Sequence, residues 1–188
     1  MVLGPAIQYP SGLEPDYWSP APGAQGYRLA LGRVAEGSSP SQLLVAIGMN
    51  PSHADEFRSD ATVNILANAS RVLGYEGWLM LNLYPQRSPS PALLGAFDPT
   101  LSRRNCEAIT SILNEFGVQE VLAAWGDLRP GPLRTAKVEV LTALAPTDVA
   151  LFHFGTLTQG GEPRHLNPRA GRYDFFAPKH VISPLQRH

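Results

Sequence analysis

The chain has 188 residues, of which 44% are hydrophobic and 16% charged, and its formal net charge is −1 at pH 7. This composition excludes a disordered chain, and the near-zero charge argues against a protein that coats nucleic acid without specificity. No apolar run approaches the ~20 residues that span a bilayer, so we expect no membrane association.

The cellular setting is inferred from the single cysteine, Cys106, and from the first residues of the chain. One cysteine allows no internal disulfide, which fits a reducing compartment. The first residues lack the basic segment and continuous apolar segment of a signal peptide. We therefore expect a cytoplasmic protein in which Cys106 is a small buried residue, and the oligomeric state stays unknown.

In chain order, residues 1–26 contain many turn residues without a sustained period, so we expect an irregular N-terminal arm. A single α/β domain is expected over residues 27–188. It begins with a partly alternating segment, 27–34, which predicts a first or edge strand, and a loop follows over 35–41. The apolar run 43–49 predicts a strand that is buried on both faces.

Three amphipathic helices are expected further along the chain. Asp60 can cap a helix over residues 61–73, and Asp98 with Pro99 begins a second helix that closes at Gly117. The third covers residues 132–144. The inward-facing residues are expected to be Ile65, Leu66, Ala69 and Leu73, then Ile109, Ile112, Leu113 and Phe116, and finally Val138, Leu141 and Leu144.

Further buried strands are expected over residues 78–83, 118–125 and 149–154, and the remainder of the chain reads as mostly loop. Short apolar strands that alternate with amphipathic helices indicate a parallel sheet covered on both faces, with right-handed crossovers. The sequence therefore predicts an α/β fold, a three-layer α/β/α sandwich around a mainly parallel sheet of four to five strands.

Polar side chains follow each buried strand. The carboxyl ends of parallel strands meet at one edge of a sheet, so these groups should converge although they lie far apart in sequence. The convergence predicts a ligand site at that edge. The residues in question are Asn50 and Ser52, then Asn82 and Arg87, then Trp125, Gly126 and Asp127, and finally Thr156, Thr158, Arg164 and His165.

The turn from Gly48 to Ser52 is the most informative segment. Gly48 permits close backbone approach, and Pro51 suits the first turn of a helix. Asn50 and Ser52 can cap that turn or face a ligand, and both interpretations stay open. Purely structural roles are equally open elsewhere, with Asn82 bonding loop backbone and Trp125 in the core.

Several familiar motifs are absent, including G-x-x-x-x-G-K-[ST], G-x-G-x-x-G and G-x-S-x-G. We expect no cofactor and no resident metal. A metal-dependent hydrolase that uses Asp55 and Asp60 stays as a minor alternative, although both residues fit loop and capping roles better.

The C-terminal segment 160–188 is locally basic, with five Lys or Arg residues against two acidic ones, a balance of +3. Such a segment can meet phosphate, and it can equally be a solvated terminus. Its charged residues are Arg164, Arg169, Arg172, Lys179 and Arg187 against Glu162 and Asp174.

Seven motifs in a fixed order carry a first resemblance, over about residues 27–173. They resemble a bacterial and phage family catalogued as a domain of unknown function, number 1643. His53 replaces the usual Thr, and Leu166-Asn167-Pro168 replaces the usual Pro-Leu-Tyr. The motifs are Asn50-Pro51-Ser52-His53-Ala54-Asp55, Asp60-Ala61-Thr62, Asn82-Leu83, Arg87-Ser88, Asn105, Ala124-Trp125-Gly126 and residues 158–165.

A second, more distant resemblance is to the uracil-DNA glycosylase superfamily. The segment Gly48-Met49-Asn50-Pro51 is similar to its first motif, in which the Asn positions the attacking water. Leu81-Asn82 is similar to the strand end whose Asn reads the base, and Trp125-Gly126 occurs on a comparable strand. For the second catalytic motif the candidates are His165 and Asn167-Pro168, and Ser52 stands where Gly is usual.

This second resemblance implies a uracil-DNA-glycosylase-like fold and a hydrolase of N-glycosidic bonds in modified bases, with DNA or a nucleotide as partner. Asn50 would orient water, Asn82 would pair with the base, His165 would donate to the leaving base, and Asp55 would serve as a base. The alternative is a nucleotide or small-molecule binding protein without turnover. The remaining substrate-binding candidates are Gly48, Met49, Pro51, Ser52, Tyr84, Arg87, Trp125, Gly126 and Arg164.

Overall fold

The computed structural model describes residues 7–20, 26–34, 42–128, 131–166 and 173–182. These residues form a mixed α/β fold with three α-helices and one seven-stranded sheet. The helices are α1 (Ala61–Val72), α2 (Pro99–Glu115) and α3 (Pro132–Leu144). The strands are β1 (Tyr17–Ser19), β2 (Ala30–Arg33), β3 (Leu43–Gly48), β4 (Gly77–Asn82), β5 (Glu120–Ala123), β6 (Ala150–Phe154) and β7 (Lys179–Ile182).

The sheet is mixed, so the prediction of a mainly parallel sheet was wrong. The order is β1-β2-β4-β3-β5-β6-β7, and only the four central strands β4, β3, β5 and β6 run parallel. β1, β2 and β7 each pair antiparallel with their neighbours. β1 and β7 were missed because they are short and lack a buried apolar pattern, and β1 lies in the segment that was expected to be irregular.

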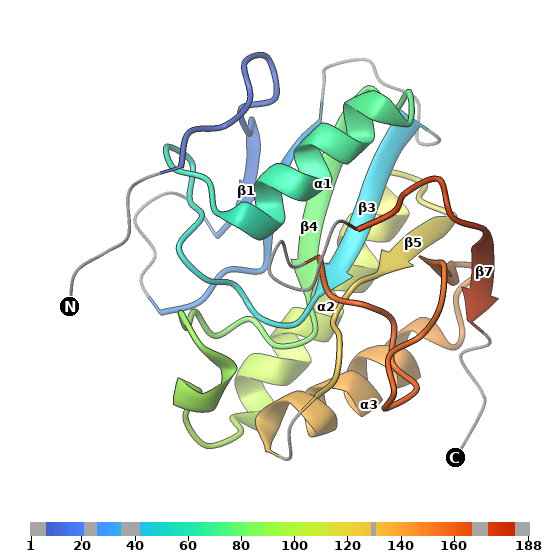
Figure 1. Cartoon of the computed structure of the whole chain (residues 1–188). Helices are drawn as coiled ribbons and strands as arrows, with labels where there is room; N and C mark the ends of the chain where they lie inside the picture. The colour runs from blue at the N-terminus through green and yellow to red at the C-terminus, as the bar shows by residue number, and fades with distance from the viewer. Residues whose placement is uncertain (1–6, 21–25, 35–41, 129–130, 167–172, 183–188) are drawn as a thin grey trace.

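The helices cover both faces of the sheet (Figure 1). Successive residues of a strand point to opposite faces. In β3, Val45 belongs to the core cluster that contains the buried residues of α2 and α3, whereas Leu44 belongs to the cluster that contains those of α1. α1 therefore covers one face of the sheet, and α2 and α3 cover the other.

The predicted helix boundaries are confirmed to within a residue or two. Asp60 caps α1 by accepting a 2.9 Å hydrogen bond from the Val63 N–H, and Asp98 caps α2 in the same way at Thr100. The inward face predicted for α3 was partly wrong, because Val138 is 64% exposed. The helix carries apolar residues on more than one face, and those that pack inward are Leu133, Ala136, Val140 and Leu144.

Strand order places a crevice at the carboxyl ends of β3 and β5. The chain passes from β3 through α1 to β4 on one side, and then through α2 to β5 on the other side of β3. Open α/β sheets bind ligands at the point where the strand order reverses in this way. None of the helices in the described ranges is long and apolar enough to cross a membrane.

Some predictions concern residues outside the described ranges. They are the loop 35–41, the candidate pair Asn167-Pro168, and the basic residues Arg169, Arg172 and Arg187 of the C-terminal segment.

Candidate functional site

A cavity of about 550 Å³ lies at the carboxyl ends of the parallel strands. Asn50 follows β3, Asn82 ends β4, and His165 belongs to the loop after β6, yet all three line this one cavity. Its volume falls within the range of small-molecule sites in proteins. The predicted residues Gly48, Met49, Ser52 and Gly126 also line it.

The carboxamide of Asn50 is fixed in orientation. Its Nδ2 donates to the carbonyl of Pro51 at 3.0 Å and to the carbonyl of Ser88 at 3.1 Å. An amide has two N–H donors, so both are used by the protein. The carbonyl oxygen Oδ1 is left as an acceptor, which can bind a water molecule or a ligand N–H group.

Asn82 presents an unused donor to the cavity. Its side chain is only 2% exposed, and its buried Nδ2 has no hydrogen-bond partner within the described part of the chain. Its Oδ1 lies 3.2 Å from where a Cβ on Gly48 would stand, so glycine at that position leaves room for the carboxamide. Because a buried unpaired donor is unfavourable by roughly 1–3 kcal/mol, this group is well suited to bind a ligand acceptor.

His165 is held over the end of β5 by Gly126. That glycine has a φ of +71°, and a Cβ added to it would lie 2.9 Å from the Cβ of His165. The N–H of Gly126 donates to the carbonyl of Pro163 at 2.8 Å, which ties the His165 loop to the segment that follows β5. Burial lowers the pKa of the His165 imidazole, and the negative charge of Asp60 partly opposes this shift. The imidazole is therefore neutral at pH 7, with one donor and one acceptor nitrogen.

The lowered pKa of His165 predicts a pH-dependent stability. The unfolded chain takes up a proton at this histidine near its ordinary value of 6.5, whereas the folded chain does so only at lower pH. The free energy of unfolding should therefore fall as pH drops below 6.5 and level off below the folded-state pKa. Denaturant melts of the wild type and His165→Asn at about pH 5.5 and about pH 7.5 test this.

In that experiment the wild type should lose more stability on acidification than His165→Asn. Burial also lowers the pKa of His153, but this residue is present in both proteins and cancels in the comparison. An equal loss in the two proteins would contradict the prediction.

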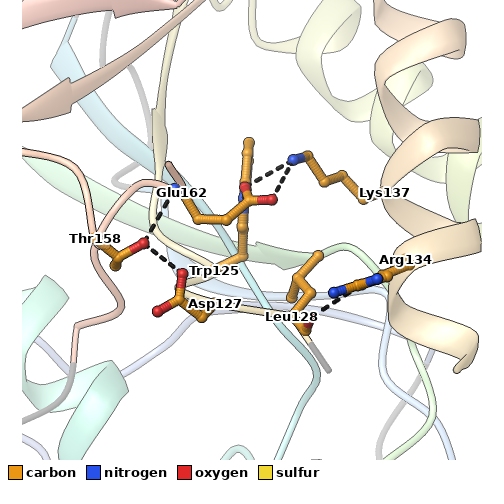
Figure 2. A network of polar contacts seen from close by, with 7 residues as sticks. All are labelled: Trp125, Asp127, Leu128, Arg134, Lys137, Thr158 and Glu162. Carbon is orange, nitrogen blue, oxygen red and sulfur yellow. Dashed lines mark hydrogen bonds and ion pairs between the residues drawn. The ribbon is translucent and has the colours of Figure 1, made fainter. Parts of the chain in front are cut away.

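A network of polar contacts anchors the loop that carries His165 (Figure 2). Glu162 accepts from Trp125 Nε1 at 2.7 Å and from Lys137 of α3 at 2.5 Å. Thr158 donates its hydroxyl to the Asp127 carboxylate and accepts from the N–H of Glu162 at 3.1 Å. The loop is thus bound both to the segment that follows β5 and to α3, which restricts where His165 can lie.

The same contacts direct Trp125 away from the substrate-binding role predicted for it. Its ring is 2% exposed and packs in the core that contains α2 and α3, with its N–H directed at Glu162. Tyr84 is also buried, where its hydroxyl accepts from the N–H of Asp98 at 2.9 Å and its ring stacks on Phe97. Neither ring lines the cavity, because both rings pack in the hydrophobic core that contains α2 and α3.

Asp55 does not line the cavity either. Its Oδ1 accepts from the N–H groups of Phe57 at 2.9 Å and Arg58 at 2.7 Å, which closes a local turn. The role of Asp55 as a base therefore has no geometric support. Asp60, in contrast, lines the cavity. Its two oxygens accept from the N–H of Val63 at 2.9 Å and from the N–H of Ala54 at 3.4 Å.

Three other predicted residues support the site from outside its lining. The carbonyl of Pro51 accepts from Asn50 and from the N–H of Ser88. Arg87 donates to the carbonyl of Ala54 at 2.9 Å, and Arg164 donates to the carbonyl of Thr156 at 3.0 Å. These contacts shape the loops around the cavity.

Sequence reasoning missed Arg28 as a site residue. It is 3% exposed and lines the cavity from the segment before β2. A charged residue inside an otherwise apolar segment was the available signal, but nothing in the sequence indicated which way it points. The polar residues Asp60, Thr62, Ser88 and Ser90, which were not proposed as substrate contacts, also line the cavity, as does Asp127, which was expected at this edge of the sheet.

Two kinds of chemistry find no support in the described ranges. No group of three His, Cys, Asp or Glu side chains there is arranged to hold a metal ion. Burial, followed by the charge of Glu139, raises the pKa of the Cys106 thiol to about 11. The thiol stays protonated at neutral pH, so Cys106 is a poor nucleophile.

Fold and site together define a mixed α/β protein with a cavity, lined largely by polar residues, at the point where the strand order of its sheet reverses. The family model described as protein of unknown function (DUF1643) matches residues 28–166, more than half of the chain, and the chain belongs to this family. The match runs from Arg28 to Leu166, so it includes every residue that lines the cavity. A search of curated proteins found no match.

Proposed function

We propose that the protein hydrolyses the N-glycosidic bond between a modified base and its sugar, in a nucleotide or in DNA. The observation that carries this proposal is that Asn50, Asn82 and His165 line one cavity although they come from three distant segments. The distant resemblance to the uracil-DNA glycosylase superfamily suggests the same roles for these residues.

The reaction needs a held water, a stabilised sugar cation and a donor to the departing base. Oδ1 of Asn50 accepts a hydrogen from water and directs its oxygen at C1′ of the sugar, where a C–O bond forms as the C–N bond breaks. The base leaves with the electron pair of the broken bond, and the neutral imidazole of His165 donates an N–H to it. The negative charge of Asp60 favours the cationic sugar, and the proton lost by the water passes to solvent.

Base recognition falls to Asn82. Its carboxamide carries both a donor and an acceptor, which match the adjacent C=O and N–H groups on the edge of bases such as uracil and hypoxanthine. Its unpaired Nδ2 gains a partner only when such a base is bound. A ligand without this edge would leave that group unpaired, which is the physical basis of selectivity.

The proposal is tested by measuring free base released from a panel of substrates. Uracil and hypoxanthine would be supplied as nucleosides, as nucleoside monophosphates and within single- and double-stranded DNA. We expect release from at least one substrate by the wild type and its loss in Asn50→Ala. The proposal is wrong if enzyme in excess over every substrate releases no base.

One observation favours a second function, a nucleotide-binding protein without turnover. Both oxygens of Asp60 are engaged by backbone N–H groups, so this carboxylate is directed at the backbone rather than at an attacking water. A thermal-shift screen separates the two functions, because a ligand that binds the folded state raises Tm. Nucleotides that raise Tm without any base release would favour the second function.

A further inference from the structure

Arg28 is a buried cation that the described part of the chain leaves almost unpaired. Its guanidinium lines the cavity, is 3% exposed and donates from Nη1 to the carbonyl of Ala54 at 2.6 Å. Within the described ranges its Nε has no hydrogen-bond partner, and no carboxylate there approaches it closely enough for an ion pair. A buried charge without a partner is strongly unfavourable, so this arrangement suggests an anionic ligand.

The charge of Arg28 persists at neutral pH. Burial lowers the pKa of its guanidinium to about 10, and the nearby positive charge of Arg87 acts in the same direction. Both guanidiniums donate to the carbonyl of Ala54, at 2.6 and 2.9 Å, so two like charges converge at one point. Asp60, Asp55 and the Tyr9 hydroxyl oppose the shift, but the two carboxylates are directed at backbone N–H groups.

The N-terminus of α1 meets the same cavity. Ala61 and Thr62 line it, and no acceptor within the described ranges bonds their backbone N–H groups. The first turn of a twelve-residue helix carries a partial positive charge, and its free N–H groups suit phosphate oxygens. Arg28 and this helix end thus provide charge and donors within one cavity.

We propose that Arg28 and the first turn of α1 bind the terminal phosphate of a mononucleotide, so that the substrate is a free nucleotide. The inference rests on the proposed function in assigning the base to Asn82 and His165. Arg28 is only 3% exposed, so a phosphate must enter the cavity to contact its guanidinium, and a terminal phosphate group can do so. A phosphodiester inside a DNA strand carries a nucleotide on each side, which keeps it from that depth.

Size and charge agree with a small substrate. A cavity of about 550 Å³ suits one nucleotide rather than a strand. The net charge of −1 provides none of the excess positive charge with which proteins usually attract the DNA backbone.

The test compares 2′-deoxyuridine 5′-monophosphate, deoxyuridine and a single-stranded oligonucleotide with one internal uracil. Base release and the shift in Tm are measured for each. We expect kcat/KM for the monophosphate to exceed those for the other two by about tenfold or more, because a charge-assisted contact to phosphate is lost in them. Inorganic phosphate should compete with the monophosphate and leave turnover of deoxyuridine little changed.

The variant Arg28→Gln should lose this preference, whereas Arg103→Gln should keep it. Arg103 lies on the surface of α2, where its side chain is 72% exposed, so its replacement removes the same charge far from the cavity. If Arg28→Gln does not fold, the wild-type preference and the phosphate competition still decide the question. Equal turnover of nucleoside and nucleotide, or preference for the oligonucleotide, overturns this inference alone.

The shift in Tm, measured alongside base release, separates this inference from the proposed function. If the monophosphate raises Tm, deoxyuridine does not, and no base is released, the phosphate site is supported and the proposed hydrolysis is rejected. An absence of both binding and release rejects both.

Discussion

Replacing His165 by alanine is expected to lower the rate of base release by about 100-fold or more, because the departing base loses its donor. The Cβ and backbone of His165 lie against Gly126, in a loop that is bound to the segment after β5 and to α3. Within the part of the loop that the structure describes, none of the anchoring hydrogen bonds involves the imidazole, so the fold should survive the substitution. Single-turnover rates measure the effect, and circular dichroism checks the fold.

The matched control for His165→Ala is His53→Ala. His53 is exposed on the loop after Asn50 and does not line the cavity, so its loss should change the rate little. Near-normal release by His165→Ala would show that the imidazole takes no part in the reaction.

The substitution Gly126→Ala is expected to reduce both stability and activity. Alanine is strained at a φ of +71°, and its Cβ would lie 2.9 Å from the Cβ of His165. We expect the free energy of unfolding to fall by about 2 kcal/mol, which is a decrease of roughly 4–8 °C in Tm. Base release should fall further than stability explains, because His165 must move away. Thermal melts and the base-release assay at a temperature well below Tm measure the two effects.

Gly74→Ala is the matched control for the backbone strain. Gly74 has a φ of +80° at the end of α1, and nothing lies within 4 Å of its added Cβ. It should lose stability while its base release stays near that of the wild type. If both variants lose activity in proportion to their loss of stability, the contact between Gly126 and His165 does not position the imidazole.

The central part of the fold is readable from local signals. Asp60 and Asp98 mark helix starts because their carboxylates bond the first free N–H groups, and Gly74 and Gly117 end the helices in the left-handed region. Local sequence signals do not predict the outer strands. β7 is mostly exposed and pairs with β6 through its backbone, which leaves no apolar alternation in the sequence.

The candidate site was predictable where sheet geometry dictates it. Asn50, Asn82 and His165 follow strands that run parallel, so their convergence follows from topology. The directions of side chains do not follow from sequence in this way. Asp55 turns back on its own loop, and Arg28 reaches the cavity from the segment just before β2, a strand whose antiparallel pairing was not expected.

The most direct measurement is a crystal structure with pseudouridine 5′-monophosphate, whose carbon–carbon glycosidic bond cannot be hydrolysed in this way. We expect the base edge to lie within hydrogen-bond distance of the Asn82 carboxamide, C1′ to face Oδ1 of Asn50, and His165 to lie beside the ring. A cavity that stays free of the nucleotide at saturating concentration, or a base held away from Asn82, would contradict this expectation.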